Sequence, residues 1–150
     1  MRAVVQRVSQ ASVSIENKIV AEIKSGFLVL LGVELEDSKE DAIWLANKIS
    51  QLRIFSDSQG KMNDSIIDID GEIIVVSQFT LHAKTKKGSR PSYIKAAKPE
   101  KAILLYEDFK EELSNLILKE VLSGKFGADM KVSMINDGPV TIIIDTKDKE

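Results

Sequence analysis

The residues best suited to chemistry lie in the segment SQFTL, Ser77 to Leu81. The apolar run EIIVV precedes it, so we expect a buried strand to deliver hydroxyl and amide groups to the edge of a sheet. Such groups, with the backbone N–H groups beside them, could bind a carbonyl substrate and stabilise an oxyanion. They could also simply satisfy the end of a strand, and the pattern alone favours that simpler interpretation.

Thr80 and His82 have the i, i+2 spacing that places two side chains on one face of a strand. A threonine hydroxyl with histidine as its base would be a nucleophile. However, His82 is the only histidine, and no carboxylate lies nearby in the sequence to orient it. We therefore expect His82 to be a solvated loop residue, and Thr80 to have a structural or hydrogen-bonding role.

A metal centre is poorly supported by the sequence. The chain has no cysteine and one histidine, so carboxylates alone would have to supply the ligands. The segment DSIIDIDGE is rich in aspartate, but it lacks the spacing of a calcium-binding loop. We expect no metal and no other cofactor.

Positive charge is concentrated directly after SQFTL. Between Glu72 and Glu100 there is no acidic residue. The interval contains six basic residues, Lys84, Lys86, Lys87, Arg90, Lys95 and Lys98. A basic loop beside a site suits phosphate groups, although such loops are also common as solvated surface. The net charge of −2 provides no general attraction to nucleic acid, so any such binding must be local.

A proline stands where a hairpin does not need one, in the segment SMINDGPVTIIID at residues 133–145. Proline cannot donate to a strand ladder, and the preceding residues NDG would already make a hairpin turn. A cis Gly138–Pro139 bond would fold the backbone sharply and turn consecutive carbonyl groups outward. A trans proline that opens an edge strand is the commoner alternative.

The elements that position these residues fit one soluble domain over residues 1–150. Its 43% apolar and 29% charged residues are ordinary for a soluble globular protein. The lack of cysteine fits a reducing compartment, and the N-terminal residues lack the apolar stretch of a signal peptide. We expect a cytoplasmic protein that does not interact with membranes.

Hydrophobic patterns predict an α+β fold. We expect antiparallel or mixed sheets that form a barrel-like sandwich, with two amphipathic helices packed on one side. The expected strands span residues 2–8, 11–15, 19–23, 27–33, 72–81, 129–135 and 139–145.

The two helices and the C-terminal tail have their own signals. One helix follows a capping box of Asp37 and Glu40 and ends near Arg53. The other begins at Pro99, because proline is favoured in the first turn. We expect residues 146–150 to form a frayed tail.

Six segments together resemble the D-aminoacyl-tRNA deacylase family, which includes the D-tyrosyl-tRNA deacylases. In chain order these are QRVSQASVSI, GFLVLLGVE, RIFSDSQGKMN, VVSQFTL, GSRPSY and NDGPVT. They cover nearly the whole chain, and SQFTL and GPVT match the two signature motifs of the family.

The resemblance implies a proofreading enzyme. It would hydrolyse the ester of D-aminoacyl-tRNA, and of glycyl-tRNA mischarged on other tRNAs, to free amino acid and tRNA. L-aminoacyl-tRNA would be rejected by a main-chain filter made by a cis Gly–Pro bond. The resemblance also implies a homodimer with active sites at the subunit interface, where the Gly–Pro motif of one subunit reaches into the site of its partner.

The motifs also imply roles for individual residues. The catalytic segment, which holds the terminal adenosine and the ester, matches Ser77, Gln78, Phe79 and Thr80. The residues that bind substrate or support the Gly–Pro loop match Gly138, Pro139, Met130 and Arg7. For contacts with tRNA we expect Lys84, Lys86, Lys87 and Arg90.

Three alternatives remain open at this point. One is a threonine-dependent esterase that acts on small esters, and another is a noncatalytic tRNA-binding module. The third is a relative that has a trans Gly–Pro bond and removes small L-residues, against which the intact SQFTL segment argues.

Overall fold

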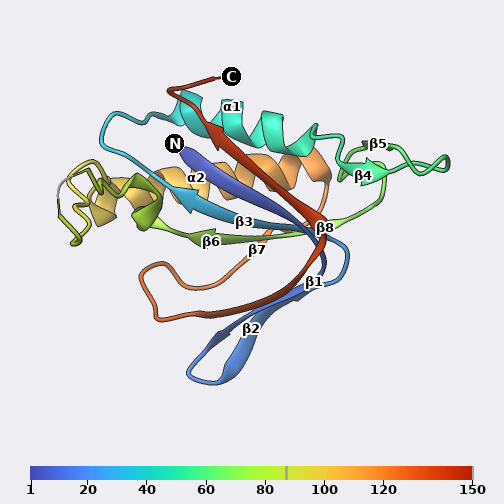
Figure 1. The fold of residues 1–150 in the computed structure, drawn as a ribbon, viewed down its shortest axis with the longest axis horizontal. Helices are drawn as coiled ribbons and strands as arrows, with labels where there is room; N and C mark the ends of the chain where they lie inside the picture. Colours follow the sequence, from blue (N-terminus) through green and yellow to red (C-terminus); the bar gives the residue numbers. More distant parts are fainter. Residues whose placement is uncertain (87, 150) are drawn as a thin grey trace.

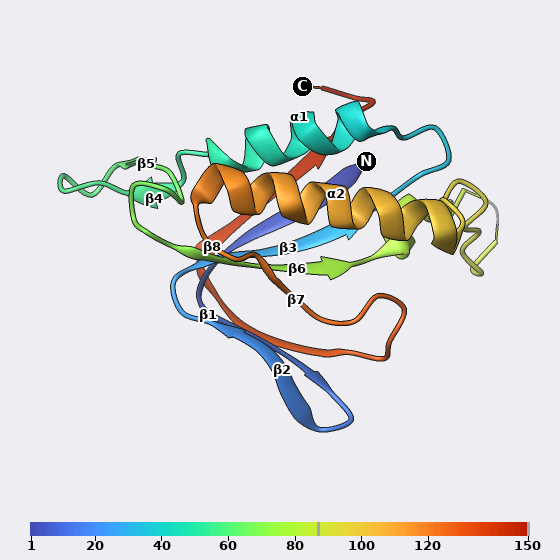
Figure 2. The same cartoon turned by 180° about the vertical axis from the view of Figure 1, so that it is seen from behind.

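The computed structural model describes residues 1–86 and 88–149. A six-stranded mixed sheet curls nearly into a barrel, and two helices pack together on one side of it (Figure 1). The view from behind shows both helices along the same face of the sheet (Figure 2). The hairpin that contains β2 projects on the side of the sheet away from the helices. The predicted α+β class and the placement of the helices are confirmed.

The helices and strands have this order along the chain. They are β1 (Arg2–Ile15), β2 (Lys18–Ile23), β3 (Gly26–Gly32), α1 (Lys39–Ser50), β4 (Phe55–Ser56), β5 (Met62–Asp64), β6 (Glu72–Ser77), the 3-10 helix η1 (Phe79–His82), α2 (Pro99–Ile117), β7 (Leu122–Ser123) and β8 (Lys131–Asp145). Strands β4 and β5 form a separate two-stranded sheet.

Strand β1 is one long strand where two were predicted. It pairs antiparallel with β2, to which a short turn joins it, and also with β3 and β8. The exposed polar pair Ser9–Gln10 gives the impression of a break in the sequence, but neither residue is a glycine or a proline that would end a strand. The polar pair coincides with a register shift against β8.

The core lies between the sheet and the two helices. Strands β3 and β6 pair in parallel, with α1 in the connection between them. Their buried side chains pack against the inner faces of both helices, and the fully buried members of this core include Phe27, Val29, Ile73, Val75, Leu45, Ile49, Phe109 and Leu113. This packing fixes the ends of β3 and β6, where the SQFTL segment begins.

The helix boundaries differ in part from the prediction. Helix α2 begins at Pro99 as predicted. Helix α1 is capped by Ser38 and Asp41 instead of Asp37 and Glu40, since the Asp41 carboxylate accepts hydrogen bonds from the Ser38 N–H and hydroxyl. It ends at Ser50, before the predicted position.

Strand β8 is also continuous where two strands were predicted. The pairs Val8–Asn136 and Gln6–Thr141 bracket residues 137–140, which bulge out of the ladder with β1. A bulge lets a strand continue past a proline that cannot donate to the ladder. The break predicted at Gly138–Pro139 is therefore a local bulge.

The start of the C-terminal tail differs from the frayed segment expected. Thr146 is 5% exposed, and its hydroxyl accepts a hydrogen bond from the Met1 nitrogen at 2.5 Å. Lys147 Nζ lies 2.9 Å from Asp41 Oδ2. Residue 150 lies outside the described residues. Within the described part of the chain, no helix is both long enough and apolar enough to span a membrane.

Candidate active site

A cavity of about 520 Å³ opens where β3 and β6 end, beside the N-terminus of α2. Ser77, Gln78 and Phe79 line it, together with Met130 from the loop before β8. Most of the remaining lining is apolar, contributed by Leu31, Val33, Val76, Ala96, Ala97, Pro99, Ala102, Phe126, Ala128 and Val132. The structure thus brings four predicted site residues to one concave surface, the usual form of a small-molecule site.

The chain turns sharply after β6. The Gln78 N–H donates to the Leu31 carbonyl at 2.8 Å, which extends the pairing with β3, and η1 begins at the next residue. The strand predicted to run to residue 81 therefore ends at Ser77. The first N–H groups of a helix have no intrahelical acceptor, and in η1 these groups belong to Phe79 and Thr80.

Thr80 interacts with its own segment. Its hydroxyl accepts a hydrogen bond from the Gln78 amide, and Thr80 is not among the described residues that line the cavity. This geometry gives Thr80 a hydrogen-bonding role and does not show it as an activated nucleophile.

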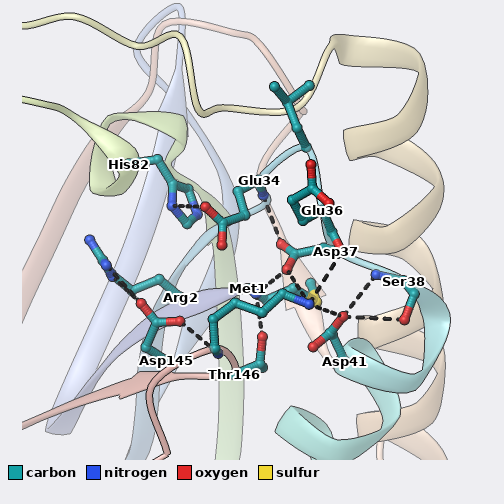
Figure 3. Close-up of polar contacts among 12 residues, drawn as sticks. Met1, Arg2, Glu34, Glu36, Asp37, Ser38, Asp41, His82, Asp145 and Thr146 are labelled. Atoms are coloured by element: carbon teal, nitrogen blue, oxygen red, sulfur yellow. Dashed lines mark hydrogen bonds and ion pairs between the residues drawn. The ribbon is translucent and has the colours of Figure 1, made fainter.

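His82 is buried, with 4% of its surface exposed, so the prediction of a solvated loop histidine is wrong. Its Nδ1 lies 3.8 Å from Glu34 Oε2, as Figure 3 shows. Glu34 is far away in the sequence, which is why the sequence alone showed no carboxylate near the histidine.

The Gly138–Pro139 bond is cis, as predicted. Arg7 is hydrogen-bonded to the bulge. Its Nε donates to the Asp137 carbonyl at 2.9 Å, and its Nη1 donates to the Ile54 carbonyl. Gly138 and Pro139 are exposed, and neither lines the 520 Å³ cavity of the same chain. Within one chain the two signature motifs are therefore not combined into one pocket.

The basic loop follows η1 directly. Lys84, Lys86 and Arg90 are exposed, while Lys87 lies outside the described residues. The Lys84 and Ser92 backbones exchange two hydrogen bonds, of 2.8 and 3.0 Å, which bring the end of the loop back beside η1. The loop therefore starts and returns beside η1, whose first residue, Phe79, lines the cavity.

Tyr93 contacts a residue of the cavity lining and was not singled out from the sequence. Its ring packs edge-on against Phe79, with ring centroids 5.0 Å apart. Both aromatic side chains are exposed, Phe79 by 54% and Tyr93 by 38%. The only sequence signal was the position of Tyr93 at the end of the segment GSRPSY.

Comparisons with known proteins show which family the chain is similar to. Residues 4–145 match the family described as D-Tyr-tRNA(Tyr) deacylase. The chain is 63% identical to the D-aminoacyl-tRNA deacylase of Flavobacterium psychrophilum and 60% identical to that of Bacteroides thetaiotaomicron, over the full length of each pair.

Two solved structures share the fold. A protein titled c-Myc DNA Unwinding Element Binding Protein superposes with a TM-score of 0.92 at 41% identity, over 97% of this chain and 98% of that one. A probable eukaryotic D-amino acid tRNA deacylase superposes with a TM-score of 0.81 at 17% identity, over 95% and 97% of the two chains, which shows a common fold.

The fold, the cavity and these matches define an enzyme of the hydrolase class. The chain belongs to the D-Tyr-tRNA(Tyr) deacylase family, as the resemblance of its motifs predicted.

Proposed function

We propose that this protein hydrolyses the ester bond of D-aminoacyl-tRNA and releases free D-amino acid and tRNA. The observation that carries the proposal is the cavity lined by Ser77, Gln78 and Phe79, in a chain 63% identical over its full length to a relative named D-aminoacyl-tRNA deacylase. We place the activity in the cytoplasm, where charged tRNA is used.

The reaction needs placement more than a strong nucleophile, because an aminoacyl ester is already activated. A water oxygen attacks the ester carbonyl carbon, and negative charge develops on the carbonyl oxygen. The N–H groups of Phe79 and Thr80 stabilise that charge, as in an oxyanion hole. The ribose 2′-hydroxyl of the substrate positions the water. The bond to the ribose oxygen then breaks, and that oxygen takes the proton that the water loses.

The exposed aromatic pair and the basic loop suit the nucleic-acid part of the substrate. Phe79 and Tyr93 offer ring surface beside the cavity on which the terminal adenine can stack. The charges of Lys84, Lys86 and Arg90 lie where the adjoining phosphates would pass.

A second copy of the chain completes the site in this proposal. Gly138 and Pro139 are exposed and lie outside the cavity of their own chain, so their main chain is free to enter the cavity of a partner. Strand β8, which carries them, pairs only with β1 among the described strands and exposes several apolar side chains, namely Val132, Met134, Ile135 and Ile143. Such an edge is suited to burial against a second copy.

Main chain at this position would select chirality independently of the side chain. With the ester carbonyl and the α-amino group both held, a D side chain points to open space and an L side chain points at the Gly138–Pro139 backbone. Many D-residues are then accepted. Glycine has no side chain to clash, so glycyl-tRNA mischarged on other tRNAs is hydrolysed too.

The dependence on tRNA separates this function from the esterase alternative. We expect rapid release of D-tyrosine from charged tRNA and negligible turnover of D-tyrosine ethyl ester at the same concentration. Equal turnover of both would favour a small-ester hydrolase. Tight binding of charged tRNA without any release would favour a noncatalytic binding module.

A further inference from the structure

The C-terminal end of η1 is held by a residue from the far end of the sequence. A short 3-10 helix leaves carbonyl groups at its C-terminal end without intrahelical donors. The Leu81 carbonyl is such a group, and Arg2 Nη1 donates to it at 2.7 Å. Arg2 is the first residue of β1, so the central strand of the sheet is tied directly to the turn that carries Phe79 and Thr80.

Arg2 is itself fixed by Asp145, the last residue of β8. The guanidinium Nε and Nη2 donate to Asp145 Oδ2 at 2.9 and 2.7 Å, as Figure 3 shows. Burial acts to raise the pKa of Asp145, but hydrogen bonds from the Lys147 N–H and from Arg2 outweigh it and lower the pKa. Asp145 is therefore a carboxylate at neutral pH and holds the arginine in one orientation.

The rear of η1 packs closely against Gly32, at the end of β3. A Cβ atom on Gly32 would lie 2.9 Å from the Gln78 carbonyl oxygen and 3.0 Å from His82 Nε2. Among the described residues, that Nε2 atom is a buried polar atom with no hydrogen-bond partner. The His82 imidazole thus packs between η1 and Gly32. The hydrogen bond from Arg2 to the Leu81 carbonyl is the directional contact at the C-terminal end of η1.

We propose that Arg2 is a positioning residue of the active site: it fixes the C-terminal end of η1 and thereby the N–H groups of Phe79 and Thr80. This inference rests on the proposed function. It also assigns a role to the contact between Arg2 and Asp145, which joins the strand that carries Gly138–Pro139 to the turn that carries the oxyanion donors.

Replacing Arg2 with alanine tests the proposal. We expect kcat for D-tyrosyl-tRNA to fall about tenfold with little change in KM, because a small displacement of positioned groups slows the chemical step. Arg2, Leu81 and Asp145 line a second cavity, of about 830 Å³, through which a small cation can enter. Added methylguanidinium should therefore restore much of kcat to Arg2→Ala.

Arg53→Ala is the matched control, because the Arg53 Nε also donates to a backbone carbonyl, that of Asn63, at 2.7 Å. Arg53 lies at the start of the β4–β5 hairpin, at the end of the molecule away from η1 (Figure 1). We expect it to keep wild-type kcat and to be insensitive to methylguanidinium. Amide hydrogen exchange at Leu81 and Ala83, whose N–H groups close the turn, should accelerate only in Arg2→Ala.

Arg2→Lys and Asp145→Asn are milder changes that keep the proposal testable if Arg2→Ala fails to fold. Each should lower kcat, by less than about tenfold. An unchanged kcat in every variant that folds would overturn the positioning role. So would a lower kcat in Arg2→Ala that methylguanidinium does not restore, together with unchanged amide hydrogen exchange at Leu81 and Ala83. In that case the proposed function would still stand if the wild-type protein hydrolyses D-aminoacyl-tRNA specifically and Phe79→Ala does so more slowly. Absence of wild-type hydrolysis would instead reject the proposed function.

Discussion

A Cβ atom added at Gly138 would clash with its neighbours. The φ of Gly138 is +134°, and a Cβ atom there would lie 2.9 Å from Arg7 Nη2 and 2.8 Å from Val140 Cγ2. Arg7 cannot move away freely, because it is 9% exposed and donates to two backbone carbonyls. The bulge and its arginine support must shift together.

We therefore expect Gly138→Ala to lower kcat/KM for D-tyrosyl-tRNA by about tenfold or more, since the displaced main chain no longer holds the substrate. Gly60→Ala is the control, because Gly60 also has a positive φ, of +76°, but a Cβ there meets nothing within 4 Å. Steady-state kinetics of the two variants check the prediction. Wild-type activity in Gly138→Ala would contradict a role for this main chain.

Thr80 provides the second prediction at this scale. Thr80→Val keeps the shape of the side chain and removes the hydroxyl that accepts from Gln78. We expect substantial activity to remain, because backbone donors and the hydroxyl of the substrate carry the chemistry. Single-turnover rates on D-tyrosyl-tRNA provide the measurement. A loss greater than about 10⁴-fold would match removal of an essential nucleophile and favour the threonine-dependent esterase.

At the scale of elements, the basic loop after η1 is expected to contribute affinity and not chemistry. Replacing Lys84, Lys86 and Arg90 with alanine should raise KM and reduce the steepness of its salt dependence by about two to three in log–log slope. The value of kcat at saturating tRNA should change little.

Removal of the same charge elsewhere controls for net charge. Alanine at Lys18, Lys24 and Lys61 removes three lysines from the β2 and β4–β5 hairpins, away from the cavity. This variant should keep the wild-type salt slope. Identical slopes for all three proteins would show that the basic loop is only solvated surface.

Helices and strands that are marked by a few neighbouring residues could be predicted from the sequence. Pro99 and the apolar spacing behind it located α2, and the apolar run before Ser77 located β6. The continuity of β1 and β8 was missed, because the polar pair at Ser9–Gln10 and the proline at Pro139 both resemble breaks. Only pairing with neighbouring strands carries the chain through them.

Whether the predicted residues form the active site stays a prediction, but the structure does bring several of them to one cavity. Ser77 to Phe79 line the cavity together with Met130, as the motifs implied. The burial of His82 and the partnership of Phe79 with Tyr93 were not predictable in this way, because each depends on segments brought together by the fold. The contact of Arg2 with Leu81 is of the same kind.

At the scale of the whole molecule, the proposed dimer makes each site composite. A variant defective at Gly138 and a variant defective at Phe79 should each have low activity alone. Mixed dimers would contain one intact site, formed by the cavity of the Gly138 variant and the Gly138–Pro139 main chain of the Phe79 variant.

We expect an equimolar mixture of Gly138→Trp and Phe79→Ala, after subunit exchange, to recover about a quarter of wild-type activity, because half of the dimers would carry one of two sites. Sedimentation of the wild-type protein at micromolar concentration checks the dimer directly. A fully active monomer, or no recovery in a mixture shown to contain mixed dimers, would contradict composite sites.

The stereochemical preference of the wild-type protein tests the central claim most directly. The measurement is the rate of amino acid release from the same tRNA charged with D-tyrosine or with L-tyrosine, at equal enzyme and substrate concentrations. The account predicts rapid release of D-tyrosine and release of L-tyrosine no faster than spontaneous hydrolysis. Release of L-tyrosine as fast as D-tyrosine would contradict it.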